Sequence, residues 1–324
     1  MKKMLLGMMV CGTLLGAAGA EATWARKDVY VRDPFVHVEG NDYYLYQSTR
    51  LGDGRIGVGV RRSSDLENWT AAATAVEIPK DVPCTAVWAP EMHTYDGKYW
   101  IFTTLSFAPV KEGDPDYLVQ PKAMTEQGFK GGTLQPRGVW VFVSDTPTGP
   151  FKPVKKGPVT PKDWMCLDGT LWVEDGVPWM VFCHEWCQTG NGRMMAAPMS
   201  KDLTHFTAEP TLLFKAADVP HGHCVTDGPF LVKTPDMGLR MIWSNFLEGS
   251  GYCVLQCVST SGKVAGPWRD HKALYTHDGG HGMLFRDGKG RLQLSLHQPN
   301  GGGKERMHLY PVAPTKDGLV RTND

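Results

Sequence analysis

The sequence has no excess of charge of either sign. Its 324 residues include 34 basic and 34 acidic side chains, so the formal net charge is zero. It also lacks any basic run interleaved with aromatic residues. Binding to nucleic acid or to an anionic membrane depends on concentrated positive charge, so neither is expected as a partner. A neutral partner fits this composition better.

Long hydrophobic runs are confined to the N-terminus. In "MKKMLLGMMVCGTLLGAAGAEA", two lysines precede an apolar run that ends in Ala18-Gly19-Ala20. This pattern predicts a secretory signal peptide over residues 1–20, cleaved after Ala20. No later stretch is long enough to span a bilayer. We therefore expect export to the periplasm or the extracellular medium, with no membrane attachment after cleavage.

The cysteines lack the setting of a zinc site. Seven of them follow the predicted signal peptide, and this odd number leaves at least one thiol unpaired. Cys183 and Cys187, like Cys253 and Cys257, have a C-x3-C spacing, but these segments are apolar and contain no glycine turns of a zinc knuckle. Buried small side chains are the favoured interpretation, and zinc binding is the alternative.

Stretches with helical periodicity are nearly absent. Short runs rich in Val, Ile, Phe, Trp and Tyr alternate instead with Gly, Pro, Asn and Asp, which predicts an all-β protein. Five hairpins turn at "EGND", "YDGK", "EDGV", "PDMG" and "RDGK", and each is followed by a third strand with its own tail. Five such units indicate a five-bladed β-propeller, because ring closure covers the last exposed sheet. We expect residues 21–324 to form this single domain.

A polar residue precedes each hairpin. These five residues, which we expect at the same position of each blade, are Asp33, Glu91, Asp168, Asp227 and His281. The first strand of a blade lines the central channel, so their side chains should meet at one mouth of it. Crowded carboxylates raise one another's pKa, and their repulsion destabilises the fold. A catalytic role explains such a cluster better than a structural role does. The alternative for each Asp is a turn residue that bonds nearby backbone N–H groups.

The motifs around these residues resemble those of glycoside hydrolase family 43. They are "RDPF" at 32–35, "WAPE" at 88–91, "LDGT" at 167–170, "DGPF" at 227–230 and "GGHGM" at 279–283. The resemblance covers nearly the whole mature chain. It implies a five-bladed propeller that hydrolyses glycosidic bonds with inversion, usually of arabinofuranosyl or xylosyl units in plant polysaccharides.

This resemblance leads us to expect a secreted α-L-arabinofuranosidase that acts on plant cell-wall oligosaccharides or polysaccharides. The alternatives are a β-xylosidase, a galactan-active hydrolase, or a catalytically weak propeller that only binds glycans. A purely binding propeller has no need of a water-activating base opposite a second acid, so retention of both Asp33 and Asp168 argues against it.

The resemblance also implies roles for individual residues. Asp33 matches the general base, Asp168 the residue that tunes the pKa of the acid, and Asp227 the general acid. Inversion needs a base and an acid on opposite faces of the sugar, with carboxyls roughly 6.5 to 9.5 Å apart. Many members of the family have Glu at the acid position, so the arm of Asp227 is one methylene shorter. Glu185 of "CHEW" is the alternative acid.

Other residues are candidates for contacts with substrate or metal. Phe35, Trp88, Glu91 and Glu185 are expected to line the sugar site, where Trp88 offers a flat face for stacking, with a place in the core as the alternative for the aromatic residues. The resemblance implies that His281 helps to hold a hydrated calcium ion in the channel. Because calcium prefers oxygen ligands, water would complete its shell. A plain polar channel residue is the alternative.

One inter-strand segment is unusually long. Residues 108–138 are rich in Gly and Pro, which indicates a loop and not a separate domain. If this loop lies at the channel mouth, it narrows the cleft and favours the release of terminal units over cleavage inside a chain.

Overall fold

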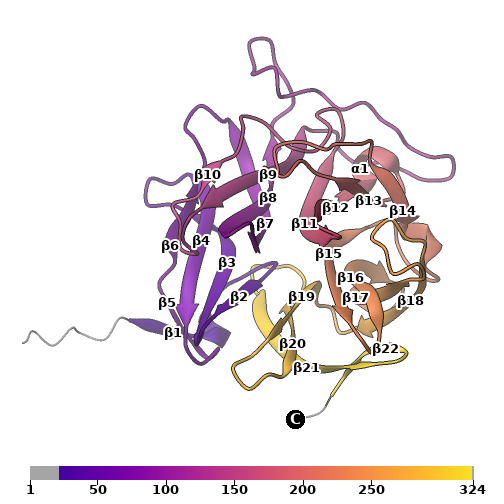
Figure 1. The fold of residues 1–324 in the computed structure, drawn as a ribbon. Helices are drawn as coiled ribbons and strands as arrows, with labels where there is room; N and C mark the ends of the chain where they lie inside the picture. Colours follow the sequence, from indigo (N-terminus) through magenta and orange to yellow (C-terminus); the bar gives the residue numbers. More distant parts are fainter. Residues whose placement is uncertain (1–21, 323–324) are drawn as a thin grey trace, which may run out of the picture.

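The protein is built from five antiparallel sheets arranged around a centre (Figure 1). The structure is a computed structural model that describes residues 22–322, so the predicted signal peptide lies outside the described residues. Each of these sheets has four strands whose order across the sheet is their order along the chain. The predicted all-β, five-bladed propeller is therefore confirmed.

The strands of each blade are given from the centre of the ring outwards. Blade one consists of β2 (Phe35–Glu39), β3 (Asp42–Arg50), β4 (Ile56–Ser63) and β6 (Ala73–Glu77). Blade two consists of β7 (Cys84–Tyr95), β8 (Lys98–Phe107), β9 (Arg137–Ser144) and β10 (Lys152–Pro153). Blade three consists of β11 (Cys166–Glu174), β12 (Val177–His184), β13 (Arg193–Pro198) and β14 (Thr211–Lys215).

The remaining elements complete and close the ring. Blade four consists of β15 (Asp227–Thr234), β16 (Gly238–Leu247), β17 (Gly251–Ser259) and β18 (Trp268–Tyr275). Blade five consists of β19 (Gly280–Arg286), β20 (Leu292–Gln298), β21 (Arg306–Thr315) and β22 (Gly318–Arg321). A small pair joins β1 (Thr23–Ala25) to β5 (Asn68–Thr70). The helical turns among residues 22–322 are η1 (Arg26–Asp28), α1 (Trp186–Thr189) and η2 (Ala216–Asp218).

Local sequence explains the inner hairpins. Asp175 and Gly176 join β11 to β12 with φ of 51° and 78°, and Asp96 and Gly97 do the same between β7 and β8. Positive φ at both central residues defines the tight turn that matches strand twist, and Asp-Gly adopts it readily. The predicted "EDGV" and "YDGK" hairpins therefore form where the sequence indicated.

The hydrophobic core is divided among the interfaces between blades. One cluster spans blades one and two and reaches Met283 and Phe285 of blade five, and three others join blades two to three, three to four and four to five. Cys183, Cys253 and Cys257 are buried in the cluster between blades three and four. The seven cysteines of the described residues are all unpaired.

The ring closes between the N-terminal segment and blade five. The backbone N–H of Val31 donates to the carbonyl of Glu305 over 3.2 Å, and the Arg306 guanidinium bonds the carbonyl of Lys27 over 2.9 Å. Tyr30 also forms a β-bridge with Arg306. These contacts bring Tyr30 and the following residues to the mouth of the channel.

The long connection between β8 and β9 packs against blade three. It arches over blade three (Figure 1), where the backbone N–H groups of Met124 and Gly132 bond carbonyls of α1 over 2.8 and 2.9 Å. Glu126 adds ion pairs to Arg193 and Lys215 at 2.7 and 3.0 Å. These partners hold the loop against blade three, with Gly132 beside Trp186, and the effect of residues 108–138 on the width of the cleft stays a prediction. The last two residues of this segment belong to β9.

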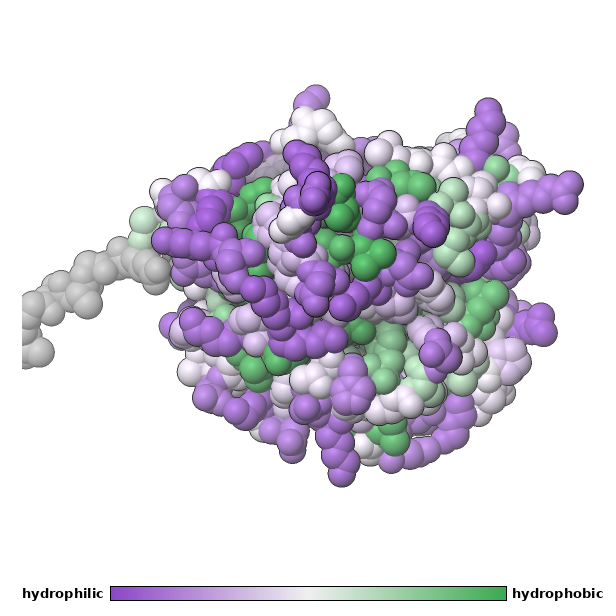
Figure 2. Space-filling model, turned by 90° about the horizontal axis from the view of Figure 1, so that it is seen from above, coloured by the Kyte–Doolittle hydropathy of each residue, from purple (hydrophilic) through white to green (hydrophobic). Residues whose placement is uncertain are grey.

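The surface is mostly hydrophilic on the face shown in Figure 2, where hydrophobic residues appear in separate patches. Among the described residues, no helix is both long and apolar enough to cross a membrane.

Candidate active site

A shared backbone conformation marks the start of each inner strand. One residue there has φ between 43° and 54° in all five blades. These five residues are Asp33, Ala89, Asp168, Gly228 and His281. The expectation of one polar residue at one common position is therefore partly wrong. Asp227 lies one residue before this position and Glu91 two residues after it, although blades two to five share the same β-bulge at the turn.

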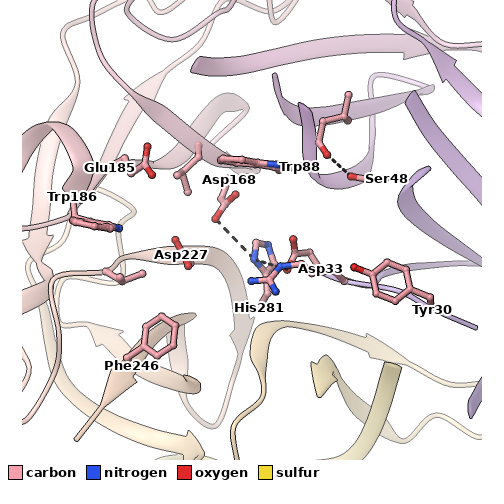
Figure 3. Close-up of a pocket in the computed structure, with 14 residues that line it drawn as sticks. Tyr30, Asp33, Ser48, Trp88, Asp168, Glu185, Trp186, Asp227, Phe246 and His281 are labelled. Atoms are coloured by element: carbon pink, nitrogen blue, oxygen red, sulfur yellow. Dashed lines mark hydrogen bonds and ion pairs between the residues drawn. The ribbon is translucent and has the colours of Figure 1, made fainter. Parts of the chain in front are cut away.

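The five turns surround a cavity of about 600 Å³ at one mouth of the channel. Residues from every blade line it, and Figure 3 shows the carboxyl groups near its centre with Trp186 and Tyr30 on opposite sides. Of the residues predicted from sequence, the lining includes Asp33, Trp88, Asp168, Glu185, Asp227 and His281. The cavity thus brings together all three proposed catalytic carboxyls.

Asp33 is held by two histidines. Its Oδ1 lies 3.4 Å from Nδ1 of His281 and 3.2 Å from Nδ1 of His297. Burial alone would raise the pKa of Asp33, but His281 and His297 outweigh it and hold this pKa below its usual range. The guanidinium of Arg32, 3.8 Å away, acts in the same direction. Asp33 is therefore a carboxylate at neutral pH.

Asp168 is buried and fixed by backbone contacts. Its N–H donates to Oγ1 of Thr104 over 3.0 Å, and its Oδ2 accepts the N–H of Gly228 over 2.9 Å. Nδ1 of His281 lies 3.9 Å from the same oxygen. Burial disfavours the charged form of Asp168, and the N–H of Gly228 stabilises that charged form.

Asp227 has the environment of an acid that keeps its proton. Burial, followed by repulsion from Asp168, raises the pKa of Asp227 to about 7. The hydroxyl of Tyr252 donates to its Oδ2 over 3.0 Å and opposes this shift. Asp33 and Asp227 therefore have pKa values that are shifted in opposite directions within one cavity, which is how acid and base roles are separated.

Glu185 sits in a different arrangement, between Arg137 and the cavity. It is only 8% exposed and forms a buried ion pair with Arg137. Burial raises the pKa of Glu185, while Arg137 opposes the rise. The same guanidinium lies over the Trp88 ring, 4.3 Å from the ring centroid. Arg137 thus joins Glu185 to Trp88, which is 36% exposed at the cavity.

Phe35 and Glu91 are not among the residues that line this cavity, and the sugar contacts expected of them stay predictions. Both follow the turn by two residues, and their side chains therefore lie deeper in the channel. Phe35 is 6% exposed in the core, 5.5 Å from the ring of His93. Glu91 is 4% exposed, and its Oε2 lies 3.1 Å from Nε2 of the same histidine.

Several residues of the site had no signal in the sequence. Arg137 is the first residue of β9, Tyr252 lies on the third strand of blade four, His297 lies on the second strand of blade five, and Tyr30 precedes the first blade. Register across strands brings Arg137, Tyr252 and His297 against residues that line the cavity, and no motif marks them. Trp186 stands in α1, directly after the Glu185 predicted from "CHEW".

The residues around His281 do not form a protein-ligated calcium site. Within residues 22–322, no group of three or more His, Cys, Asp or Glu side chains could hold a metal ion. Nε2 of His281 is buried without a hydrogen-bond partner, but one nitrogen is a poor ligand for calcium. A calcium ion held mainly through water stays a prediction, and no chemical step is derived from it.

Comparison with known proteins gives concordant matches. Residues 28–319 match the family described as Glycosyl hydrolases family 43. The structure of an endo-arabinase from Bacteroides thetaiotaomicron VPI-5482 is 34% identical, covers 89% of this chain and 96% of its own, and superposes with a TM-score of 0.74.

Two further relatives differ in extent. The extracellular endo-alpha-(1->5)-L-arabinanase 1 of Bacillus subtilis (strain 168) is 34% identical over 98 residues, which are 28% of this chain and 30% of that relative's length. The structure of an alpha-L-arabinofuranosidase from Lactobacillus brevis is 17% identical with a TM-score of 0.67, covers 90% of this chain and 93% of its own, and shows the fold alone.

Proposed function

The chain belongs to glycosyl hydrolases family 43, and on this basis we propose that it is an inverting hydrolase that cleaves α-L-arabinofuranosyl linkages inside arabinan chains. The observation that carries the proposal is the opposite shift of two pKa values in one cavity. The pKa of Asp33 is lowered and that of Asp227 is raised to about 7. A glycoside hydrolase needs one carboxylate and one carboxylic acid at the same pH.

In the proposed mechanism, Asp33 is the general base. Its carboxylate removes a proton from water, and that water attacks the anomeric carbon from the face opposite the leaving group. His281 and His297 keep Asp33 ionised and oriented. The attack forms the new carbon–oxygen bond as the glycosidic bond breaks, so the product has the inverted configuration.

Asp227 is the proposed general acid. It donates its proton to the glycosidic oxygen as that oxygen departs, and a pKa of about 7 keeps it mostly protonated in mildly acidic solution and about half protonated at neutral pH. Asp168 raises this pKa by its charge and fixes the turn at Gly228, directly after the acid. Glu185 is paired with Arg137, which favours a role in positioning over proton donation.

Cleavage inside a chain is supported by the form of the cavity. The long loop lies against blade three and contributes no side chain to the cavity lining. Trp186 and Tyr30 flank the carboxyls on opposite sides (Figure 3), so sugar rings on both sides of the cleaved bond have aromatic faces to contact. Two relatives are described as endo-acting. Release of single arabinofuranosyl units, the action expected from sequence, is the alternative.

Export of the protein fits this function, because plant cell-wall polysaccharide cannot enter a cell. The predicted signal peptide over residues 1–20 supports it, and the Bacillus subtilis relative is described as extracellular. Trp88 and Glu185 are the proposed sugar contacts on blades two and three.

The test is the product pattern from linear α-1,5-arabinan, with arabinoxylan and galactan as comparison substrates. We expect a rapid fall in viscosity and a ladder of oligosaccharides from arabinan, with proton NMR showing β-configured reducing ends as the first product. Arabinose as the sole early product would contradict internal cleavage. Equal or faster release of sugar from arabinoxylan or galactan would contradict the substrate assignment.

A further inference from the structure

We propose that Tyr252 is a positioning residue that fixes the short carboxyl arm of Asp227 for proton donation, so that the length of the acid and the place of this phenol are matched. The proposal rests on the proposed function, in which Asp227 is the general acid. Tyr252 lies on β17, the third strand of blade four, and does not itself line the cavity.

The contact between the two side chains is direct and shielded from water. The Tyr252 hydroxyl donates to Oδ2 of Asp227 over 3.0 Å, and Tyr252 is 1% exposed. With Oδ2 engaged, Oδ1 is the oxygen left to carry the proton toward the cavity that Asp227 lines. A short arm with one fixed oxygen has few orientations, and orientation of the donor governs the efficiency of proton transfer.

The phenol ring cannot move away from Asp227. A Cβ on Gly280 would come within 2.3 Å of two of its ring carbons, so the ring lies directly on that backbone. His297 stacks on the ring with centroids 5.6 Å apart and planes at 23°, and Phe246 packs at 4.9 Å. Three neighbours thus fix the position of the hydroxyl.

The same packing reaches the proposed base. His297 is fully buried, and its Nδ1 lies 3.2 Å from both the backbone nitrogen and Oδ1 of Asp33. The stacked pair of Tyr252 and His297 therefore supports the acid on one side and the base on the other. Their relative placement follows from one packed layer.

The arrangement leaves little room for a longer acid. Replacement of Asp227 by Glu adds one methylene, about 1.5 Å of reach. The added length would push a carboxyl oxygen toward the Tyr252 hydroxyl, which lies 3.0 Å from Oδ2 in the present structure. That hydroxyl cannot retreat, because the Gly280 backbone lies directly against the phenol ring. We infer that Asp is required at position 227 as long as Tyr252 keeps its hydroxyl.

The first test is Tyr252→Phe, measured on α-1,5-arabinan across pH. We expect kcat to fall about 10 to 100-fold with little change in KM. The alkaline limb of the profile should move to higher pH, because a donor to the carboxylate favours its ionised form and the variant lacks that donor. Tyr46→Phe is the matched control. It removes the hydroxyl of a buried tyrosine of blade one, which donates to the carbonyl of Pro147 in blade two over 2.5 Å, and should leave the profile unchanged.

A second route does not depend on the phenylalanine variant. Gly280→Ala places a methyl group against the ring and should displace Tyr252, with the same movement of the alkaline limb. An unmoved limb in soluble, folded preparations of both variants would overturn the proposal.

A double-mutant cycle tests the matching of lengths. Asp227→Glu alone should lose at least 10-fold in kcat, and Tyr252→Phe in that background should restore about 10-fold by removing the obstructing oxygen. If the double variant instead shows the product of the two single-variant losses in kcat, with no restored activity, the proposed match between the acid's length and the Tyr252 hydroxyl is contradicted. Asp227→Ala separates this inference from the proposed function. If Asp227→Ala loses activity mainly on substrates with natural leaving groups while Tyr252→Phe changes neither kcat nor the pH profile, only this inference fails. If the loss in Asp227→Ala is not selective, the acid assignment fails.

Discussion

The backbone N–H of Gly228 donates a hydrogen bond of 2.9 Å to Oδ2 of Asp168. This bond ties blade three to the turn that directly follows Asp227. Gly228 has φ of 50°, and a Cβ on it would lie 2.9 Å from the His281 ring. Blade four therefore has glycine where three other blades have a longer side chain, and its carboxyl comes from the preceding residue.

Asp168→Asn should move the alkaline limb of the pH–rate profile to lower pH. The charge of Asp168 raises the pKa of Asp227, so its removal lets Asp227 ionise at lower pH and lose its proton earlier. Turnover at neutral pH should fall about 10 to 10³-fold. The direction is opposite to that expected for Tyr252→Phe. A limb that stays in place would show that Asp168 acts on orientation alone.

Asp33→Asn should lower turnover by about 10² to 10⁴-fold while product sugar still binds. The amide preserves the shape of the side chain but cannot accept the proton of water. Steady-state kinetics on arabinan and calorimetric titration with arabinose measure the two effects. Near-normal turnover with any substrate of the unmodified enzyme would place the base elsewhere.

Arg137→Met should lower both stability and affinity for sugar. The change leaves Glu185 buried without its partner, which typically costs about 3 to 5 kcal/mol. It also removes the guanidinium that lies over Trp88, so KM should rise more than kcat falls. Chemical denaturation and kinetics measure these effects, and Arg137→Met/Glu185→Gln should recover most of the stability. Unchanged KM in a folded variant would contradict the link to Trp88.

The calcium prediction can be tested through His281. If an ion held mainly through water supports the pocket, EDTA should lower activity and added calcium should restore it. His281→Ala should already be low and should respond to neither treatment. Chelation without effect on a sample of known metal content would leave His281 as a neighbour of Asp33 and Asp168 only.

The repeat pattern sufficed to predict the fold, because Asp-Gly turns and apolar runs determine hairpins locally. The repeat pattern also predicted that Asp33, Asp168 and His281 lie at one mouth of the channel, where all three line the cavity. The register within each turn was not predictable in the same way. Ala89, and not Glu91, has the positive φ in blade two, and the β-bulge that contains it depends on pairing with the next strand.

Residues that support the site from other strands could not be predicted. Arg137, Tyr252 and His297 contact functional side chains across sheet register and between blades, over separations of 25 to 264 positions. The course of the long loop depends on Arg193 and Lys215, which attract Glu126, and on carbonyls of α1. Composition alone could not place it on blade three.

The most direct test of the account compares Asp227→Ala and Glu185→Ala on two leaving groups. A sugar alkoxide needs protonation to depart, whereas a nitrophenolate leaves almost unaided. We predict that Asp227→Ala loses about 10³-fold on arabino-oligosaccharides, far less on a nitrophenyl arabinofuranoside, and also loses its alkaline limb. Glu185→Ala should lower both rates by similar factors. The selective loss in Glu185→Ala instead would contradict the central claim that Asp227 is the general acid.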